Sequence, residues 1–61
     1  MTKKVYYIEN SIALEDALES LALVIPCFID RELIEMNYSE ITVTARVEDF
    51  ATVENYLAAL V

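Results

Sequence analysis

The stretch "EITVTARVE", residues 40–48, decides the fold, because its apolar and polar side chains alternate. A β-strand points successive side chains to opposite faces, so this pattern predicts a strand with one buried face. The polar set, expected to face water or a partner, is Thr42, Thr44, Arg46 and Glu48. The apolar set, expected in the core, is Ile41, Val43, Ala45 and Val47.

A second strand is predicted at residues 3–9, "KKVYYIE", which are rich in β-branched and aromatic side chains. Val5 and Tyr7 share one face of it, and Tyr6 and Ile8 share the other. Since both faces are apolar, we expect this strand to be central or covered on both sides. At least one of the two tyrosines should then lie in the core.

Residues 11–26, "SIALEDALESLALVIP", predict an amphipathic helix capped by Asn10 or Ser11. Pro26 should end this helix near Val24 or Ile25. Its apolar stripe, taken at about 100° per residue, is Leu14, Ala17, Leu18, Leu21 and Ile25. A last helix should start at Asp49 or Thr52, with an apolar side of Phe50, Val53, Leu57 and Leu60.

Residues 26–37, "PCFIDRELIEMN", admit two interpretations. Ile29, Leu33 and Met36 recur at helical spacing, and Glu32 and Glu35 favour a helix, which is the interpretation we prefer. The alternative is a strand near residues 32–37 that turns through residues 37–39 into the next strand. The chain has no glycine, so positions of positive φ are expected at Asn or Asp, with Asn10 and Asn37 near the element boundaries.

These elements predict an α+β fold within one domain, residues 1–61. A small antiparallel sheet of two or three strands should be packed on one face by two or three helices. The element order is β-α-(α)-β-α, or β-α-β-β-α if residues 32–37 form a strand. An exposed sheet edge would be free to pair with a second copy or with a partner's strand.

Charge restricts the function. Eleven acidic residues outnumber four basic ones, giving a net charge of −7, and from Glu9 onward the only bases are Arg31 and Arg46. Direct binding to nucleic acid or to an anionic membrane is disfavoured, because both need clustered Lys and Arg. A basic protein surface is favoured as the partner. The alternative is that the acids serve only solubility.

Catalysis is not expected. The chain has no histidine and one cysteine, Cys27, whose neighbours are apolar and which we place in the core with a raised pKa. Glu15 and Glu19 share a helix face, but the spaced Asp/Asn loop of a calcium site is missing, so no metal and no cofactor are expected. A lone cysteine without a signal-like segment is typical of the cytoplasm.

The candidate partner-binding residues follow from the charge. Glu15, Asp16 and Glu19 group on one side of the predicted helix, and Leu23 falls among them; Glu9 ends the preceding strand nearby. A leucine among acids would add a desolvated anchor to an electrostatic patch. The alternatives are that the segment after Pro26 covers it, or that it is an ordinary exposed leucine. Tyr38, in the polar "NYSE", is the candidate aromatic anchor.

In size, net charge, lack of cofactor chemistry and α+β pattern, the chain resembles the small acidic inhibitors encoded by bacteriophages and mobile elements, anti-CRISPR proteins above all. The resemblance implies a stoichiometric, non-enzymatic inhibitor, and a possible DNA mimic, that occupies the DNA-binding or PAM-reading surface of a Cas effector in the host cytoplasm. Such a surface is lined with Lys and Arg. Two other classes remain open: a small homodimeric interaction or regulatory module, and an antitoxin or adaptor subunit paired with a basic protein.

Overall fold

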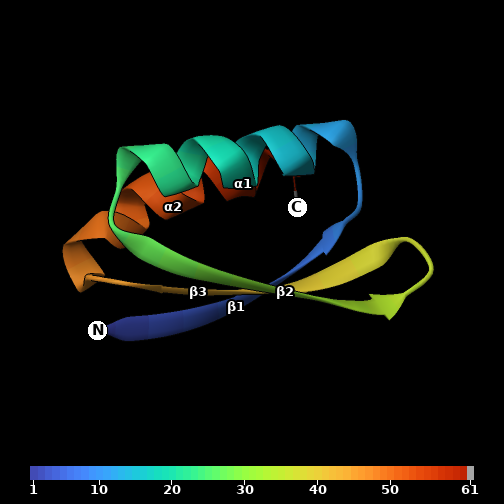
Figure 1. Cartoon of the computed structure of the whole chain (residues 1–61), viewed down its shortest axis with the longest axis horizontal. Coiled ribbons are helices and arrows are strands. Elements are labelled where there is room, and N and C mark those ends of the chain that lie inside the picture. Colours follow the sequence, from blue (N-terminus) through green and yellow to red (C-terminus); the bar gives the residue numbers. More distant parts are fainter. Residues whose placement is uncertain (61) are drawn as a thin grey trace.

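The computed structural model of the protein describes residues 1–60, and it confirms the α+β class. The element order is the second of the two expected, β-α-β-β-α. The elements are β1 (Thr2–Glu9), α1 (Ile12–Val24), β2 (Cys27–Glu35), β3 (Tyr38–Ala45) and α2 (Phe50–Leu57), with 3₁₀ turns at Val47–Asp49 and Ala58–Leu60. Both helices lie over the same face of the sheet, and the other face is bare (Figure 1).

The three strands are antiparallel in the order β1-β3-β2, so β3 is central. The prediction that residues 3–9 form a central or doubly covered strand is wrong, because β1 is an edge. Ile8 faces the helices and is buried, and Tyr6 on the same face is partly buried. On the other face Val5 is 48% and Tyr7 58% exposed, since no second layer covers them.

The preferred helix over residues 26–37 is also wrong. β2 pairs with β3 from Cys27 to Glu35, and the hairpin turns at Met36 and Asn37. Cross-strand pairing along this length outweighs the helix propensity of the glutamates. The register shifts between Leu33 and Glu35, which leaves Ile34 as a β-bulge.

Helix α1 begins and ends as expected. The Ser11 hydroxyl caps it by accepting a hydrogen bond from the Leu14 N–H at 3.0 Å. The helix stops at Val24, two residues before Pro26. Leu14 and Leu21 are fully buried against the sheet.

Most of the expected core is confirmed. Val47 is 71% exposed, because β3 ends at Ala45 and Val47 opens a 3₁₀ turn instead. Ala17, Leu18, Ile25 and Leu60, expected on the apolar sides of the helices, are only partly buried. No residue in the described part of the chain has a positive φ, so the expected role of the asparagines is wrong. The buried apolar residues are Ile8, Leu14, Leu21, Ile41, Val43, Ala45, Phe50, Val53 and Leu57.

Candidate functional site

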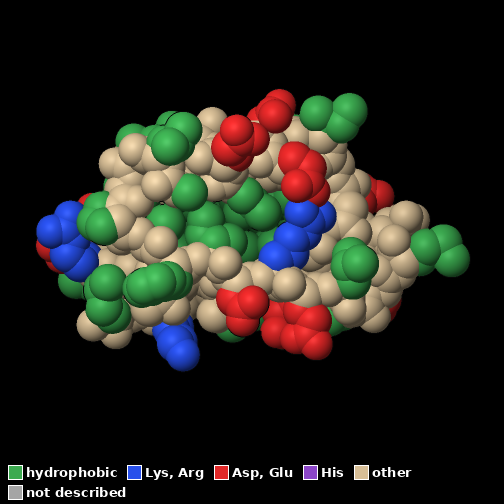
Figure 2. All heavy atoms as spheres, in the orientation of Figure 1, with side chains coloured by type: hydrophobic (Ala, Val, Ile, Leu, Met, Phe, Trp, Pro, Cys, Tyr) green, Lys and Arg blue, Asp and Glu red, His purple; other side chains and the backbone are tan. Residues whose placement is uncertain are grey.

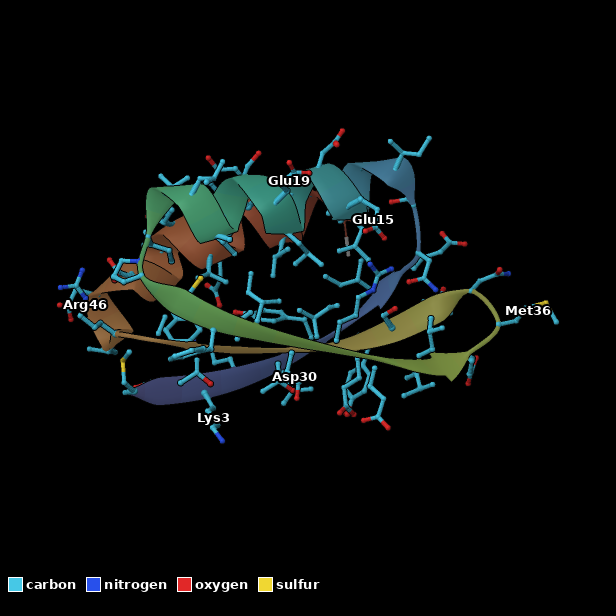
Figure 3. All side chains as sticks on the ribbon, viewed as in Figure 1. Lys3, Glu15, Glu19, Asp30, Met36 and Arg46 are labelled. Atoms are coloured by element: carbon cyan, nitrogen blue, oxygen red, sulfur yellow. The ribbon has the colours of Figure 1, made fainter. Side chains whose placement is uncertain are left out.

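The face of the sheet that points away from the helices, here called the open face, carries most of the uncompensated charge. In the register of the sheet, the even-numbered residues of β3 and the odd-numbered residues of β1 share this face. In Figure 3, Lys3 and Asp30 extend from the sheet on the side away from the helices. The acidic residues of the open face are Glu9, Asp30, Glu32, Glu35 and Glu40. Lys3 lies on the same face, at the opposite end of β1 from Glu9.

Strand register explains how these acids converge. Glu32 of β2 lies directly opposite Glu40 of β3, and Asp30 opposes Thr42 in the adjacent row. Glu35 pairs with Tyr38 and so shares its face. Without the bulge at Ile34, simple alternation would turn Glu35 toward the helix side. The bulge therefore adds a carboxylate to the open face.

The arrangement of Glu32 and Glu40 disfavours folding. Directly opposed residues on one face have Cβ atoms about 5 Å apart, and like charges there destabilise a sheet. Neither carboxylate belongs to an ion pair within residues 1–60. Stability alone does not explain why two acids occupy this cross-strand pair.

Three of the four basic residues, Lys4, Arg31 and Arg46, form ion pairs with acids outside the open face. Lys4 contacts Glu54 at 3.4 Å. Arg46 contacts Asp49 at 3.0 Å. Figure 2 shows acidic side chains above α1 and below the sheet, and basic ones mostly apart from the lower group. The open face therefore keeps a strongly negative character.

Arg31 is held within the fold by three other side chains. Its guanidinium forms an ion pair with Glu15 of α1, and its Nη2 donates to Asn10 Oδ1 at 2.8 Å. Its Nε donates to the Ser39 hydroxyl at 3.2 Å, and that hydroxyl donates to Asn10 Oδ1. Ser39 is fully buried, so this network satisfies a buried polar group. It joins β2 and β3 to Asn10, the residue after β1, and to the first turn of α1.

Aromatic and aliphatic side chains accompany the acids. Tyr7 lies opposite Glu40, and Tyr38 lies between Glu9 and Glu35 in one cross-strand row. Tyr38 is 42% exposed and Phe28, at one corner of the face, 74% exposed. Exposed aromatic side chains are enriched in protein-binding surfaces, where they act as anchors.

The structure separates the predicted partner-binding residues into two groups. Glu9 and Tyr38 are cross-strand neighbours on the open face. Asp16, Glu19 and Leu23 are exposed on α1, in the other layer, with Leu23 at 85%. Figure 3 shows Glu19 directed away from the sheet. The segment after Pro26 does not cover Leu23, and Glu9 does not join the helix acids.

Glu15 differs from the other helix acids, because Arg31 already compensates its charge. Sequence reasoning also missed Asp30, Glu32, Glu35 and Glu40. The signal that predicts them is the placement of acids two residues apart, Asp30 and Glu32, which in a strand puts both on one face. Assigning residues 26–37 to a helix hid this spacing.

The chemistry of Cys27 is limited. Cys27 is partly buried against the core. Burial, and after it the negative charge of Asp49, raises the pKa of its thiol, as expected from its apolar neighbours. Within residues 1–60 no cluster of three or more potential ligand side chains is placed to hold a metal ion. Neither α-helix is long and apolar enough to cross a membrane.

Comparison with known proteins adds no assignment: no family model matches the chain, and neither a curated protein nor a solved structure matches it.

Proposed function

We propose that the protein is a non-enzymatic inhibitor that binds, through the open face, a basic nucleic-acid-binding surface of another protein, such as a Cas effector subunit. The observation that carries the proposal is the opposed pair Glu32 and Glu40, neither of which forms an ion pair within residues 1–60. Like charges held in register disfavour the free protein. A partner's lysines and arginines would relieve that repulsion on binding.

The sheet presents these charges on a rigid frame. Neighbouring strands are about 4.8 Å apart and alternate residues along a strand about 6.8 Å apart. Because the carboxylates are spaced by the backbone, they need little reordering when a basic surface approaches. Long-range attraction between the −7 charge of the chain and a Lys/Arg-lined site would also speed the encounter.

The aromatic groups give the same face a second kind of contact. Salt screens a purely electrostatic patch, whereas Tyr7, Phe28 and Tyr38 supply area that is removed from water. Tyr38 belongs to the residues predicted from sequence, and Glu9 beside it as well. The acids of α1 are the alternative contact surface, with Leu23 as its anchor.

The test is competition for DNA. Purified Cas effector complexes are incubated with fluorescently labelled target DNA, and DNA binding is followed by anisotropy as the protein is added. We expect the protein to displace DNA from one effector at near-stoichiometric concentration, and displacement to weaken at high salt. Full DNA binding by every effector at saturating protein would contradict the proposal.

Two matched double variants locate the contact surface. Glu32→Lys with Glu40→Lys reverses the open face, and Asp16→Lys with Glu19→Lys reverses the same number of charges on α1. We expect the first variant to inhibit at least about tenfold less well, mainly through slower association. The second should lose little. The reverse ranking would assign binding to α1, where Leu23→Ala should then speed dissociation.

A further inference from the structure

Strand β1 has a free edge whose sequence is complementary to itself. It pairs with β3 on one side only, in unbroken register from Thr2 to Glu9. It contains neither proline nor a bulge, two of the devices that protect an edge strand, and Lys3 and Lys4 supply a third, charge. Lys3 and Lys4 stand near one end and Glu9 at the other. An antiparallel copy would therefore bring opposite charges together.

Hydrogen-bond geometry shows which backbone groups point outward. The Asn10 N–H donates to the Asn37 carbonyl, which continues the ladder between β1 and β3. Residues in an antiparallel ladder alternate between bonding to one neighbour and to the other side. The even-numbered residues of β1 therefore bond to β3. The backbone groups of Lys3, Val5, Tyr7 and Glu9 point to the free edge.

We infer that two copies of the chain pair through β1, antiparallel about Tyr6, to form a continuous six-stranded sheet. In this register Lys3 lies opposite Glu9 of the second copy, and Val5 opposite Tyr7 of the second copy. Both pairs recur by symmetry, so they supply about eight backbone hydrogen bonds. Opposite charges and an apolar pair at these positions stabilise a sheet.

Symmetry supports this register. Opposed residues share a face of a sheet, and here every pair joins odd to odd or even to even positions. The helices of both copies then lie on one side, and both open faces lie on the other. Moving the centre to Val5 places Lys3 opposite Tyr7, and moving it to Tyr7 places Val5 opposite Glu9. Only the register about Tyr6 pairs the charges.

The other free edge is unsuitable for self-pairing. β2 carries the bulge at Ile34, and two of its acids, Asp30 and Glu32, lie near its middle. Pairing two β2 strands about Arg31 would oppose Asp30 of one copy to Glu32 of the other. Charge also favours β1, whose 3–9 segment has two lysines and one glutamate in a chain of net charge −7. The two monomers repel each other least at this edge.

Sedimentation equilibrium of the full chain tests the dimer. An edge contact is smaller than a standard interface of about 1,600 Å², so we expect a reversible dimer with a Kd on the order of 1–100 μM. Val5→Pro removes an N–H that points to the free edge and leaves the bonds to β3 intact, so it should abolish dimerisation while the circular dichroism spectrum persists. A parent protein that stays monomeric to about ten times the upper limit of that range overturns the inference.

A charge exchange tests the register. Lys3→Glu and Glu9→Lys should each weaken the dimer about tenfold, because each homodimer then opposes like charges twice. An equimolar mixture of the two variants should dimerise as the parent does, since both charged pairs are restored in the heterodimer. A mixture that remains as weak as the single variants overturns the inference. Both results are independent of whether the open face binds a basic protein.

Discussion

The two faces of the sheet differ in whether their charged side chains are paired. On the face that the helices cover, here called the covered face, Arg31 is bound by Glu15, Asn10 and Ser39. The buried hydroxyl of Ser39 has hydrogen-bond partners in Arg31 and Asn10. On the open face, Glu32 and Glu40 are opposed with no base between them. Both faces are built from the same strands, so strand formation alone does not account for the difference.

The two faces distinguish acids that are engaged within the fold from acids that are available to a partner. Glu15 resembles Asp16 and Glu19 in sequence, yet it is engaged by Arg31 while they are not in an ion pair in the described part of the chain. An acid that stabilises the fold is a poor candidate for a partner. An acid whose position disfavours folding, such as Glu40, is a better one.

The side chains of the covered face should contribute most of the free energy of unfolding, and a substitution at Leu57 tests this. Leu57 is fully buried between α2 and the sheet, so Leu57→Ala should lower the free energy of unfolding by about 2–5 kcal/mol. Phe28→Ala, on the open face at 74% exposure, should change it by about 0.5 kcal/mol or less. Urea denaturation of both variants measures the difference. Equal losses would mean that the open face is covered in solution.

Loss of the Arg31 network should have the next largest effect on the free energy of unfolding. Arg31→Met keeps the aliphatic length and removes the ion pair to Glu15 and two hydrogen bonds, so we expect a loss of about 1–2 kcal/mol. Arg46→Met removes a guanidinium that is more exposed than that of Arg31 and contacts Asp49, and it should cost less than about 1 kcal/mol. If the two variants unfold alike, the network does not distinguish the covered face.

Part of this contrast could be predicted from sequence. The alternation in residues 40–48 correctly predicted the buried face of β3 at Ile41, Val43 and Ala45. The stripe on α1 and the stop before Pro26 were also correct. These signals are local, because they depend on side-chain period and on backbone limits of proline.

The rest depends on pairing across the chain. Whether residues 27–35 form a strand is settled by β3 beside them, which supplies partners that no local propensity encodes. The opposition of Glu32 and Glu40 is a property of register, and so is the position of Glu35 after the bulge. The network of Arg31 joins residues of β2, β3 and α1 with Asn10, which lies between β1 and α1. For these reasons the α1 acids were visible in the sequence and the open face was not.

Removing the repulsion between Glu32 and Glu40 on the open face should stabilise the fold. Glu40→Gln and Glu32→Gln should each raise the free energy of unfolding by about 0.2–1 kcal/mol. The double variant should gain less than the sum, because the same repulsion is removed only once. Asp16→Asn on α1 is the matched control and should show no coupling to Glu40→Gln. Additive effects of the two glutamates in thermal or urea unfolding would contradict the opposed pair.

The smallest expected effect concerns Tyr6, at the margin of the covered face. Burial first, and then the Glu54 carboxylate that accepts the phenol hydrogen bond at 3.3 Å, raise the pKa of Tyr6. The folded state thus holds the phenol proton more tightly than the unfolded chain, whose tyrosines titrate near about 10. This contribution to stability is complete below that pH and is lost as the pH rises through the higher folded-state pKa. Tyr6→Phe should therefore lose less stability than the parent between about pH 9.5 and 11. Tyr7→Phe, which removes a hydroxyl from the open face, is the control, and an equally flattened pH dependence in that variant would assign the effect to loss of any tyrosine rather than to the contact with Glu54.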